Sequence, residues 1–242
     1  MMKRVIAVPA VLAAAAFAAP AVAQAATLGP NKACYGGGDK LVLFGGGYTP
    51  GGKVTLAANG APLSPPVTAG ALGTPQAGVI AGSLGVPFLT TSTTKTDVFS
   101  ATDATNPALA ASTPVKRSIL RVIVKPQNAS TYKTRRFSAR GFTTGKTLYR
   151  HTVRGRRVSN SRQGTLKTAC HTLSFKRRLF RKTAKTGTYR VQFDTTRKYS
   201  SKTVQRVRFR VRVYRIVRRA SAASAASATG SNRLRSVWTQ VK

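Results

Sequence analysis

Apolar and polar side chains alternate without interruption in residues 207–213, VRFRVRV, near the C-terminal end of the chain. Valines and a phenylalanine occupy every second position, and arginines occupy the positions between them. Because successive side chains of a β-strand point to opposite faces of a sheet, this period of two predicts a half-buried strand. One face of that strand packs into a core, and the other presents arginine at each position.

Residues 115–218 contain further segments of this kind and are predicted to form about seven short strands. We expect strands at 119–124, 135–140, 147–154, 170–175 and 188–194, a weak strand near Val158, and the closing strand VRFRVRV. In the segment 147–154, Tyr149, His151 and Val153 are placed on the core side, with Arg150, Thr152 and Arg154 facing solvent. Seven strands in about 100 residues are typical of an immunoglobulin-like sandwich.

Residues 27–114 also consist of short strand-like runs, at 41–44, 54–56, 79–80 and 97–100, separated by Gly-, Pro-, Ser- and Thr-rich segments. No helical period is visible after the N-terminal 25 residues. We therefore predict an all-β chain with two tandem Ig-like β-sandwich domains, 27–114 and 115–218.

An internal repeat indicates that the two domains are related. GYTPGGKVTLAANG begins at Gly47 and GFTTGKTLYRHTVRG begins at Gly141, 94 residues later. Both segments read glycine, aromatic, threonine, any residue and glycine, followed by a lysine that opens a strand. Glycine at the first position permits the positive φ that a tight corner needs. A chance match between two Gly- and Thr-rich segments is the alternative.

These segments also carry a resemblance to a known family. LVLFGGGYTPGGKVTLAANG and RRFSARGFTTGKTLYRHTVRG, together with DVFSATDATNP and GTYRVQFDTTRKYS, resemble the strands of secreted bacterial Ig-like and fibronectin-III-like tandem repeat proteins. The likeness covers roughly residues 35 to 215. It implies a sandwich fold and export, and it brings no catalytic residue. The charge of this chain departs from that pattern, which leaves the partner open.

The N-terminus predicts an exported protein. A short basic segment, residues 1–4, precedes an apolar run at 5–22 that ends in the small-x-small triplets Ala-Val-Ala and Ala-Gln-Ala. We interpret residues 1–25 as a signal peptide cleaved after Ala23 or Ala25. A retained membrane anchor is the alternative, but Pro9 and Pro20 interrupt the run. No later segment has the length and hydropathy of a transmembrane segment, so we expect a secreted or cell-surface-associated protein.

Two further features concern covalent and terminal structure. Cys34 and Cys170 are the only cysteines, and an oxidising compartment favours one disulfide that joins the two halves; two free buried thiols are the alternative. The C-terminal segment 219–242 includes an Ala- and Ser-rich run at 220–230 and is interpreted as a disordered low-complexity tail, with a frayed helix as the alternative.

Charge divides the chain into two unlike halves. The protein has 41 Lys and Arg, four acidic residues that are all aspartate, and a net charge of +37. Residues 27–114 hold four lysines and three aspartates, whereas residues 115–242 hold 35 Lys and Arg against Asp194 alone. Such asymmetry indicates a polyanionic partner for the second half.

No constellation of residues suggests catalysis. His151 and His171 lack ligand-like or triad-like spacing, and the glycine triplets 36–38 and 45–47 lack the Lys-Ser/Thr ending of a phosphate loop. His151 is interpreted as a hydrogen-bonded histidine inside or lining the sandwich. We expect no enzyme activity, no cofactor, no metal and no small-molecule substrate.

Strand parity defines the candidate site as an arginine-rich sheet face with adjoining loops. Guanidinium groups bind phosphate and sulfate in bidentate fashion, which favours contact with a charged polymer backbone. The expected partner is a wall polymer, an acidic polysaccharide, a lipid phosphate or extracellular DNA. The alternatives are a nucleic-acid-binding protein and a structural module without a specific ligand. The candidate polyanion-binding residues are Arg150, Arg154, Arg156, Arg157, Arg190, Arg206, Arg208, Arg210 and Arg212.

Overall fold

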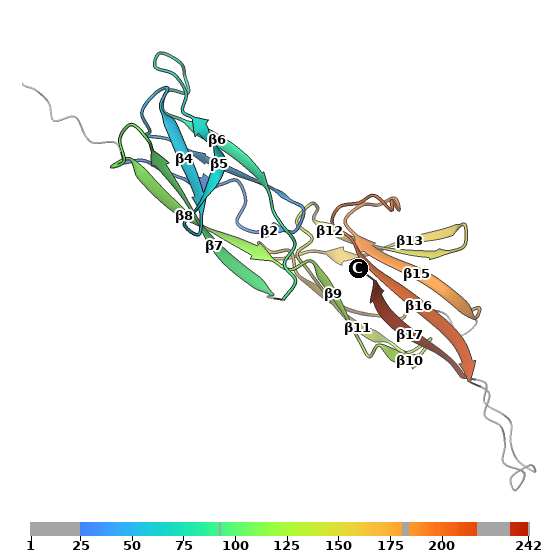
Figure 1. Cartoon of the computed structure of the whole chain (residues 1–242). Coiled ribbons are helices and arrows are strands. Elements are labelled where there is room, and N and C mark those ends of the chain that lie inside the picture. The colour runs from blue at the N-terminus through green and yellow to red at the C-terminus, as the bar shows by residue number, and fades with distance from the viewer. Residues whose placement is uncertain (1–24, 92, 181–183, 217–232, 242) are drawn as a thin grey trace, which may run out of the picture.

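The computed structural model describes residues 25–91, 93–180, 184–216 and 233–241. In those ranges the chain forms strands and no helix, so no helix of the described residues could span a membrane. The strands build two β-sandwiches in tandem, coloured blue to green and yellow-green to red in Figure 1. The predicted all-β class with two tandem sandwiches is confirmed. The predicted signal peptide lies outside the described residues except for Ala25.

The first sandwich packs a three-stranded sheet, in the order β1-β3-β6, against a five-stranded sheet, in the order β2-β8-β7-β4-β5. Buried side chains of both sheets, among them Leu43 and Phe99, form its core. Its strands are β1 (Gly29–Pro30), β2 (Tyr35–Gly36), β3 (Lys40–Gly45), β4 (Lys53–Ala58), β5 (Ala61–Thr68), β6 (Ile80–Gly85), β7 (Thr94–Asp103) and β8 (Ala110–Ser118).

β5 and β8 were not expected from the sequence, because prolines interrupt them. β5 contains Pro62, Pro65 and Pro66 and lies at the edge of the five-stranded sheet. β8 contains Pro114, which pairs with β7 on one side of the strand. The other neighbour of β8, strand β2, pairs only with Arg117 and Ser118 and does not reach Pro114. Proline lacks an N–H group and is tolerated where one side of a strand has no partner.

The second sandwich packs a three-stranded sheet, β14-β11-β9, against a six-stranded sheet, β10-β17-β16-β15-β12-β13. Four aromatic rings, those of Phe137, Phe193, Phe209 and Trp238, meet in its core. Its strands are β9 (Arg121–Lys125), β10 (Asn128–Ser130), β11 (Arg135–Arg140), β12 (Thr147–Arg154), β13 (Arg157–Thr165), β14 (Leu173–Arg177), β15 (Gly187–Asp194), β16 (Val207–Ile216) and β17 (Arg233–Val241).

The prediction of a disordered tail at 219–242 is wrong for residues 233–241. The Ala- and Ser-rich run at 220–230 lies outside the described residues, but β17 forms a strand inside the six-stranded sheet, between β10 and β16. Trp238 is 2 % exposed and belongs to the core. The fully buried guanidinium of Arg135 donates to the Ser236 carbonyl (3.2 Å) and to the Ser236 hydroxyl (2.9 Å), which ties β17 to the opposite sheet.

The boundary between the domains lies later than the predicted position after residue 114. β8 continues to Ser118, because Val115 is buried in the first core and Arg117 pairs with Asp97 of β7. Only Ile119 and Leu120 separate β8 from β9 of the second domain. The link between the domains is therefore very short.

The internal repeat corresponds to one structural element in each domain. Gly47 and Gly141 both have positive φ, 85° and 78°, and the aromatic residues that follow, Tyr48 and Phe142, are both buried. In each domain the chain then enters a strand, β4 or β12. The sequence repeat therefore marks the same corner of two related sandwiches.

Candidate anion-binding surface

The closing strand β16 has the predicted parity. Phe209, Val211 and Val213 are buried, whereas the side chains between them are exposed or half-buried. The alternation therefore directs the guanidinium groups of Arg208, Arg210 and Arg212 to the outer face of the six-stranded sheet.

Neighbouring strands extend this outer face. In an antiparallel pair, directly opposed residues share a face, and Arg190 of β15 lies opposite Arg210. On the other side of β16, Arg235 of β17 lies opposite Tyr214, which shares the parity of the β16 arginines. We call these five side chains the arginine face: Arg190, Arg208, Arg210, Arg212 and Arg235.

The arginine face has little charge compensation. Alternate side chains of one strand are about 7 Å apart and neighbouring strands about 5 Å apart, so the five cations are crowded. Like charges directly opposed across strands, as in Arg190 and Arg210, are destabilising. The ion pairs found among the described residues involve other cations. The face is thus a positively charged surface that an external anion could neutralise.

The one acidic residue of the second domain is already used. Asp194 is fully buried and accepts hydrogen bonds from His151 Nε2 (3.0 Å), the Gln192 amide (2.6 Å) and the Thr196 backbone N–H (2.8 Å). Burial alone would raise the pKa of Asp194, but these hydrogen bonds outweigh it and lower the pKa. The carboxylate therefore stays ionised, and its negative charge is buried and paired with His151.

His151 forms a structural pair with Asp194. Burial lowers the pKa of its imidazole, and the hydrogen bonds to Asp194 and to the Asn160 side chain (2.8 Å) outweigh that effect and raise it. Both ring nitrogens are occupied and the ring is fully buried, so His151 has no free nitrogen to accept a proton from a substrate. Its interpretation as a hydrogen-bonded histidine is confirmed.

The predicted orientation of β12 is wrong. Arg150 lies opposite Phe193 and Thr152 opposite Val191, and both partners are core residues, so the side chains at even positions of β12 face inward. Leu148 shares that parity and is buried in the same core. Arg150 is therefore not part of the outer face, and burial, followed by the nearby charge of Arg177, lowers its pKa.

The opposite face of β12 carries the residues that were assigned to the core. His151 and Val153 share the outer face with Gln192 and Arg190, their partners on β15. They are nevertheless buried, and the ring of Tyr199, from the loop after β15, packs against the His151 ring at 5.8 Å between centroids. Because apolar residues occur at both parities of TLYRHTVR, hydrophobicity alone did not distinguish the two faces.

The remaining predicted arginines lie outside the arginine face. Arg154 stacks on the Tyr189 ring, 5.4 Å from its centroid, and donates to the Thr186 carbonyl at 3.2 Å. Arg156 and Arg157 are exposed at the turn between β12 and β13. Arg206 precedes β16 and donates to the Thr203 carbonyl. The structure thus brings together Arg190, Arg208, Arg210 and Arg212 from the predicted set.

A second cationic row was missed. Lys125 of β9, Arg136 of β11 and Lys176 of β14 lie directly opposite one another across the three-stranded sheet, and all three are exposed. The signal was present in the sequence, since the apolar Phe137 and Ala139 alternate with the polar residues of that strand. Both outer faces of the second domain are therefore basic.

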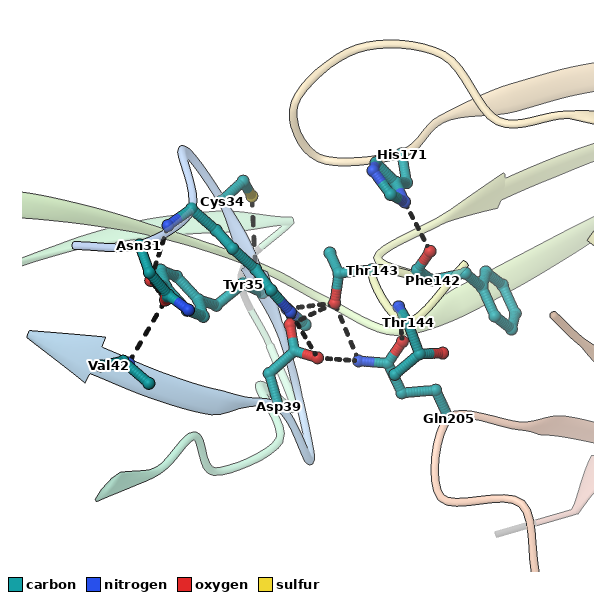
Figure 2. Close-up of polar contacts among 12 residues, drawn as sticks. Asn31, Cys34, Tyr35, Asp39, Val42, Phe142, Thr143, Thr144, His171 and Gln205 are labelled. Atoms are coloured by element: carbon teal, nitrogen blue, oxygen red, sulfur yellow. Dashed lines mark hydrogen bonds and ion pairs between the residues drawn. The ribbon is translucent and has the colours of Figure 1, made fainter. Parts of the chain in front are cut away.

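A polar cluster and a disulfide join the two domains. Cys34 and Cys170 form the predicted disulfide, with their Cα atoms 5.1 Å apart. Beside it, Gln205 Nε2 donates to Asp39 Oδ1 (3.2 Å) and to Thr143 Oγ1 (2.9 Å), and the Thr143 hydroxyl bonds to the same carboxylate, as Figure 2 shows. The buried Asp39 therefore connects the first domain to two segments of the second.

The glycine triplet 36–38 has a packing role at this junction. The Gly36 N–H donates to the Asp39 carboxylate (2.9 Å) and to the Thr143 hydroxyl (3.0 Å). A Cβ atom on Gly36 would clash with the backbone carbonyl of Gly141. Gly36 lacks a side chain because the backbone of the second domain approaches it closely.

Comparisons with known proteins identify no family for this chain. No family model and no curated protein matches the chain. Among solved structures, the chain is similar to the human OSCAR ligand-binding domain, with 14 % identity, a TM-score of 0.32, and coverage of 75 % of this chain and 94 % of that one. It is also similar to a tetra-tandem repeat from the extending region of a large adhesion protein, with 15 % identity, a TM-score of 0.27, and coverage of 90 % of this chain and 63 % of that one. No functional property follows from either likeness.

Proposed function

We propose that this protein is a non-catalytic extracellular module that binds anionic polymers through the arginine face. The proposed ligands are polymers with phosphate, sulfate or carboxylate groups at short intervals, such as wall polymers, acidic polysaccharides or extracellular DNA. Lipid phosphates displayed on a surface have the same chemistry. Attachment to such a polymer would hold an exported protein at the cell envelope or matrix.

The crowding of uncompensated arginines on one sheet face carries this proposal. Two of them, Arg190 and Arg210, are directly opposed although such a pair disfavours folding. A bound polyanion would remove that repulsion and would form charge-assisted hydrogen bonds with several guanidinium groups at once. Contact of this kind reads a charged backbone and is insensitive to the order of its units.

The affinity for a polyanion should depend steeply on salt. Each phosphate contact contributes a slope of about −0.7 to −0.9 to a plot of log K against log salt concentration. Four contacts therefore contribute a slope of about −3, and the binding of a polyphosphate chain should weaken correspondingly between low and physiological salt.

The test compares two variants of equal charge. One replaces Arg190, Arg210, Arg212 and Arg235 by glutamine, which keeps part of each aliphatic stem. The control replaces four exposed arginines elsewhere on the second domain, Arg156, Arg157, Arg177 and Arg178. Affinities for long-chain polyphosphate, dextran sulfate and a DNA duplex are measured by fluorescence anisotropy over a range of salt concentrations, with circular dichroism as the folding control.

The arginine-face variant should lose most of its affinity and reduce the magnitude of the salt slope by about 3, whereas the control should change both much less. Equal losses in the two variants would mean that net charge alone governs binding, and the proposed surface would be rejected. Preference for the duplex over the other two polymers would instead favour a nucleic-acid-binding protein.

A further inference from the structure

A groove lies between the two domains, away from the centre of the arginine face. Its volume is about 910 Å³, within the range of ligand-binding pockets, which often form at domain interfaces. Segments of both domains, the short link between them and the end of β17 contribute to it. Its lining is Phe88, Leu89, Thr90, Ile119, Leu120, Arg121, Lys202, Val204, Arg206, Val207, Arg208, Gln240 and Val241.

One part of the groove is apolar and open to solvent. Phe88 is 51 % exposed, Val204 58 % and Val241 40 %, and all three line the same groove. Leu89 and Leu120 add partly buried surface beside them. Isolated exposed apolar residues are common, but several around one concave site mark a place where apolar material binds.

The other part of the groove is cationic. Arg121 and Lys202 are exposed, and Arg206 and Arg208 are half-buried. The lining contains no acidic residue. Arg206 is positioned by its hydrogen bond to the Thr203 carbonyl. An occupant that satisfies both parts must combine an apolar body with an anionic group.

The junction described above holds the groove in shape. Phe88 packs so closely on Gly37, and Val204 on Gly38, that a Cβ atom on either glycine would clash with them. The interdomain disulfide and the Gln205–Asp39 hydrogen bond lie in the same junction. A site whose walls are fixed before binding loses less entropy when a ligand arrives.

We infer that this groove binds a single anionic amphiphile, namely an alkyl chain that carries a phosphate group. The alkyl chain of the ligand lies against Phe88, Val204 and Val241, and its phosphate is held by Arg121 and Lys202 with Arg206 nearby. The site is separate from the arginine face, although Arg208 lies at the edge of both. This choice of ligand rests on the proposed function: a protein held at the cell envelope would meet phosphate-bearing lipids, and the groove would take up one lipid molecule at a time.

The first experiment tests the two parts of the ligand. Isothermal titration uses dodecyl phosphate, dodecyl maltoside and inorganic phosphate, each below its micelle concentration where one exists. Dodecyl phosphate should bind the oxidised full-length protein with 1:1 stoichiometry, at least tenfold more tightly than either control compound. Equal binding of dodecyl maltoside, or uptake of many molecules per protein, would overturn the inference.

The second experiment locates the site. The Phe88→Ser/Val204→Ser variant is compared with Phe44→Ser/Val158→Ser, which alters exposed apolar residues elsewhere, 50 % and 44 % exposed. The Arg121→Gln/Lys202→Gln variant is compared with Lys133→Gln/Arg178→Gln, which alters exposed cations elsewhere.

Both groove variants should weaken dodecyl phosphate binding about tenfold or more and leave polyphosphate binding by the arginine face intact. The arginine-face variant retains Arg208 and should show the reverse pattern. Loss of dodecyl phosphate binding in the control variants, or its retention in the groove variants, would reject the site without bearing on the arginine face.

Discussion

Replacing Trp238 tests whether β17 belongs to the folded second domain. Trp238 is 2 % exposed, and its ring meets those of Phe209 and Phe137 at 5.5 Å and 5.9 Å between centroids. A buried tryptophan removes about 200 Å² from water, worth about 5 kcal/mol at 25 cal/mol per Å². Its indole N–H has no hydrogen-bond partner among the described residues, and this offsets about 1–2 kcal/mol.

We therefore expect Trp238→Ala to lower the free energy of unfolding of the second domain by about 3–4 kcal/mol, within the usual range for such substitutions. Trp238→Phe should cost about 1 kcal/mol or less, because it removes the unpaired N–H along with some volume. Since small domains are stable by only about 5–15 kcal/mol, the alanine variant should be visibly weakened.

The assay is urea denaturation followed by far-ultraviolet circular dichroism, with Val158→Ala, at an exposed position, as the control. Because Trp238 is the single tryptophan, the emission of the wild-type protein reports this strand directly and should be that of an indole shielded from water. A native spectrum of a solvent-exposed indole, or an alanine variant within about 0.5 kcal/mol of wild type, would refute the docking of β17.

Three further predictions follow from the described contacts. Burial lowers the pKa of His151, but its carboxylate partner outweighs this and raises the pKa, so the stabilisation by that pair is complete below about pH 6.5 and is lost as the pH rises through the folded-state pKa. The difference in stability between wild type and His151→Gln should therefore shrink from pH 6 to pH 9. A difference that grows over this range would contradict the pairing. The disulfide between Cys34 and Cys170 spans 136 residues, and the chain-entropy relation gives its removal a cost of about 5 kcal/mol, to be checked by denaturation with and without reductant; unchanged midpoints would argue against it. Gly36→Ala should destabilise the protein by about 2 kcal/mol or more, because the added Cβ clashes with backbone. Gly85→Ala, whose Cβ would meet nothing within 4 Å, should leave the midpoint of thermal denaturation almost unchanged. Equal effects of the two substitutions would exclude close packing at Gly36.

The strands that the sequence predicted well are those in which alternation and charge agree. In β16 the odd positions from Val207 to Val213 are apolar and the even positions from Arg208 to Arg212 are arginine, so only one orientation avoids burying cations. In β12, Leu148 is the inward residue and Val153 the outward one, and both are apolar. On the outer face Tyr199, from the loop after β15, packs against the buried His151, and a tertiary cover of that kind leaves no local signal in the strand itself.

Features that depend on contacts between distant segments of the chain could be predicted from the sequence only in part. The two cysteines allowed a single intramolecular pairing, so the disulfide could be predicted. β17 was hidden because RLRSVWTQV follows a low-complexity run, and its stability comes from Trp238 and from the cross-sheet hydrogen bonds of Arg135. The groove joins residues near 88, 120, 204 and 241, which no local pattern connects.

The position of β17 also determines when the second domain can close. Among the described strands, β10, residues Asn128–Ser130, pairs only with β17, so a chain that emerges N-terminus first must reach residues 233–241 before β10 can pair. Until then one side of β16 has no neighbour, and an unpaired hydrophobic strand invites association with identical chains. The guanidinium groups along that strand would repel such copies during the interval, so the same charges that attract a polymer in the finished protein also protect the unfinished one from self-association.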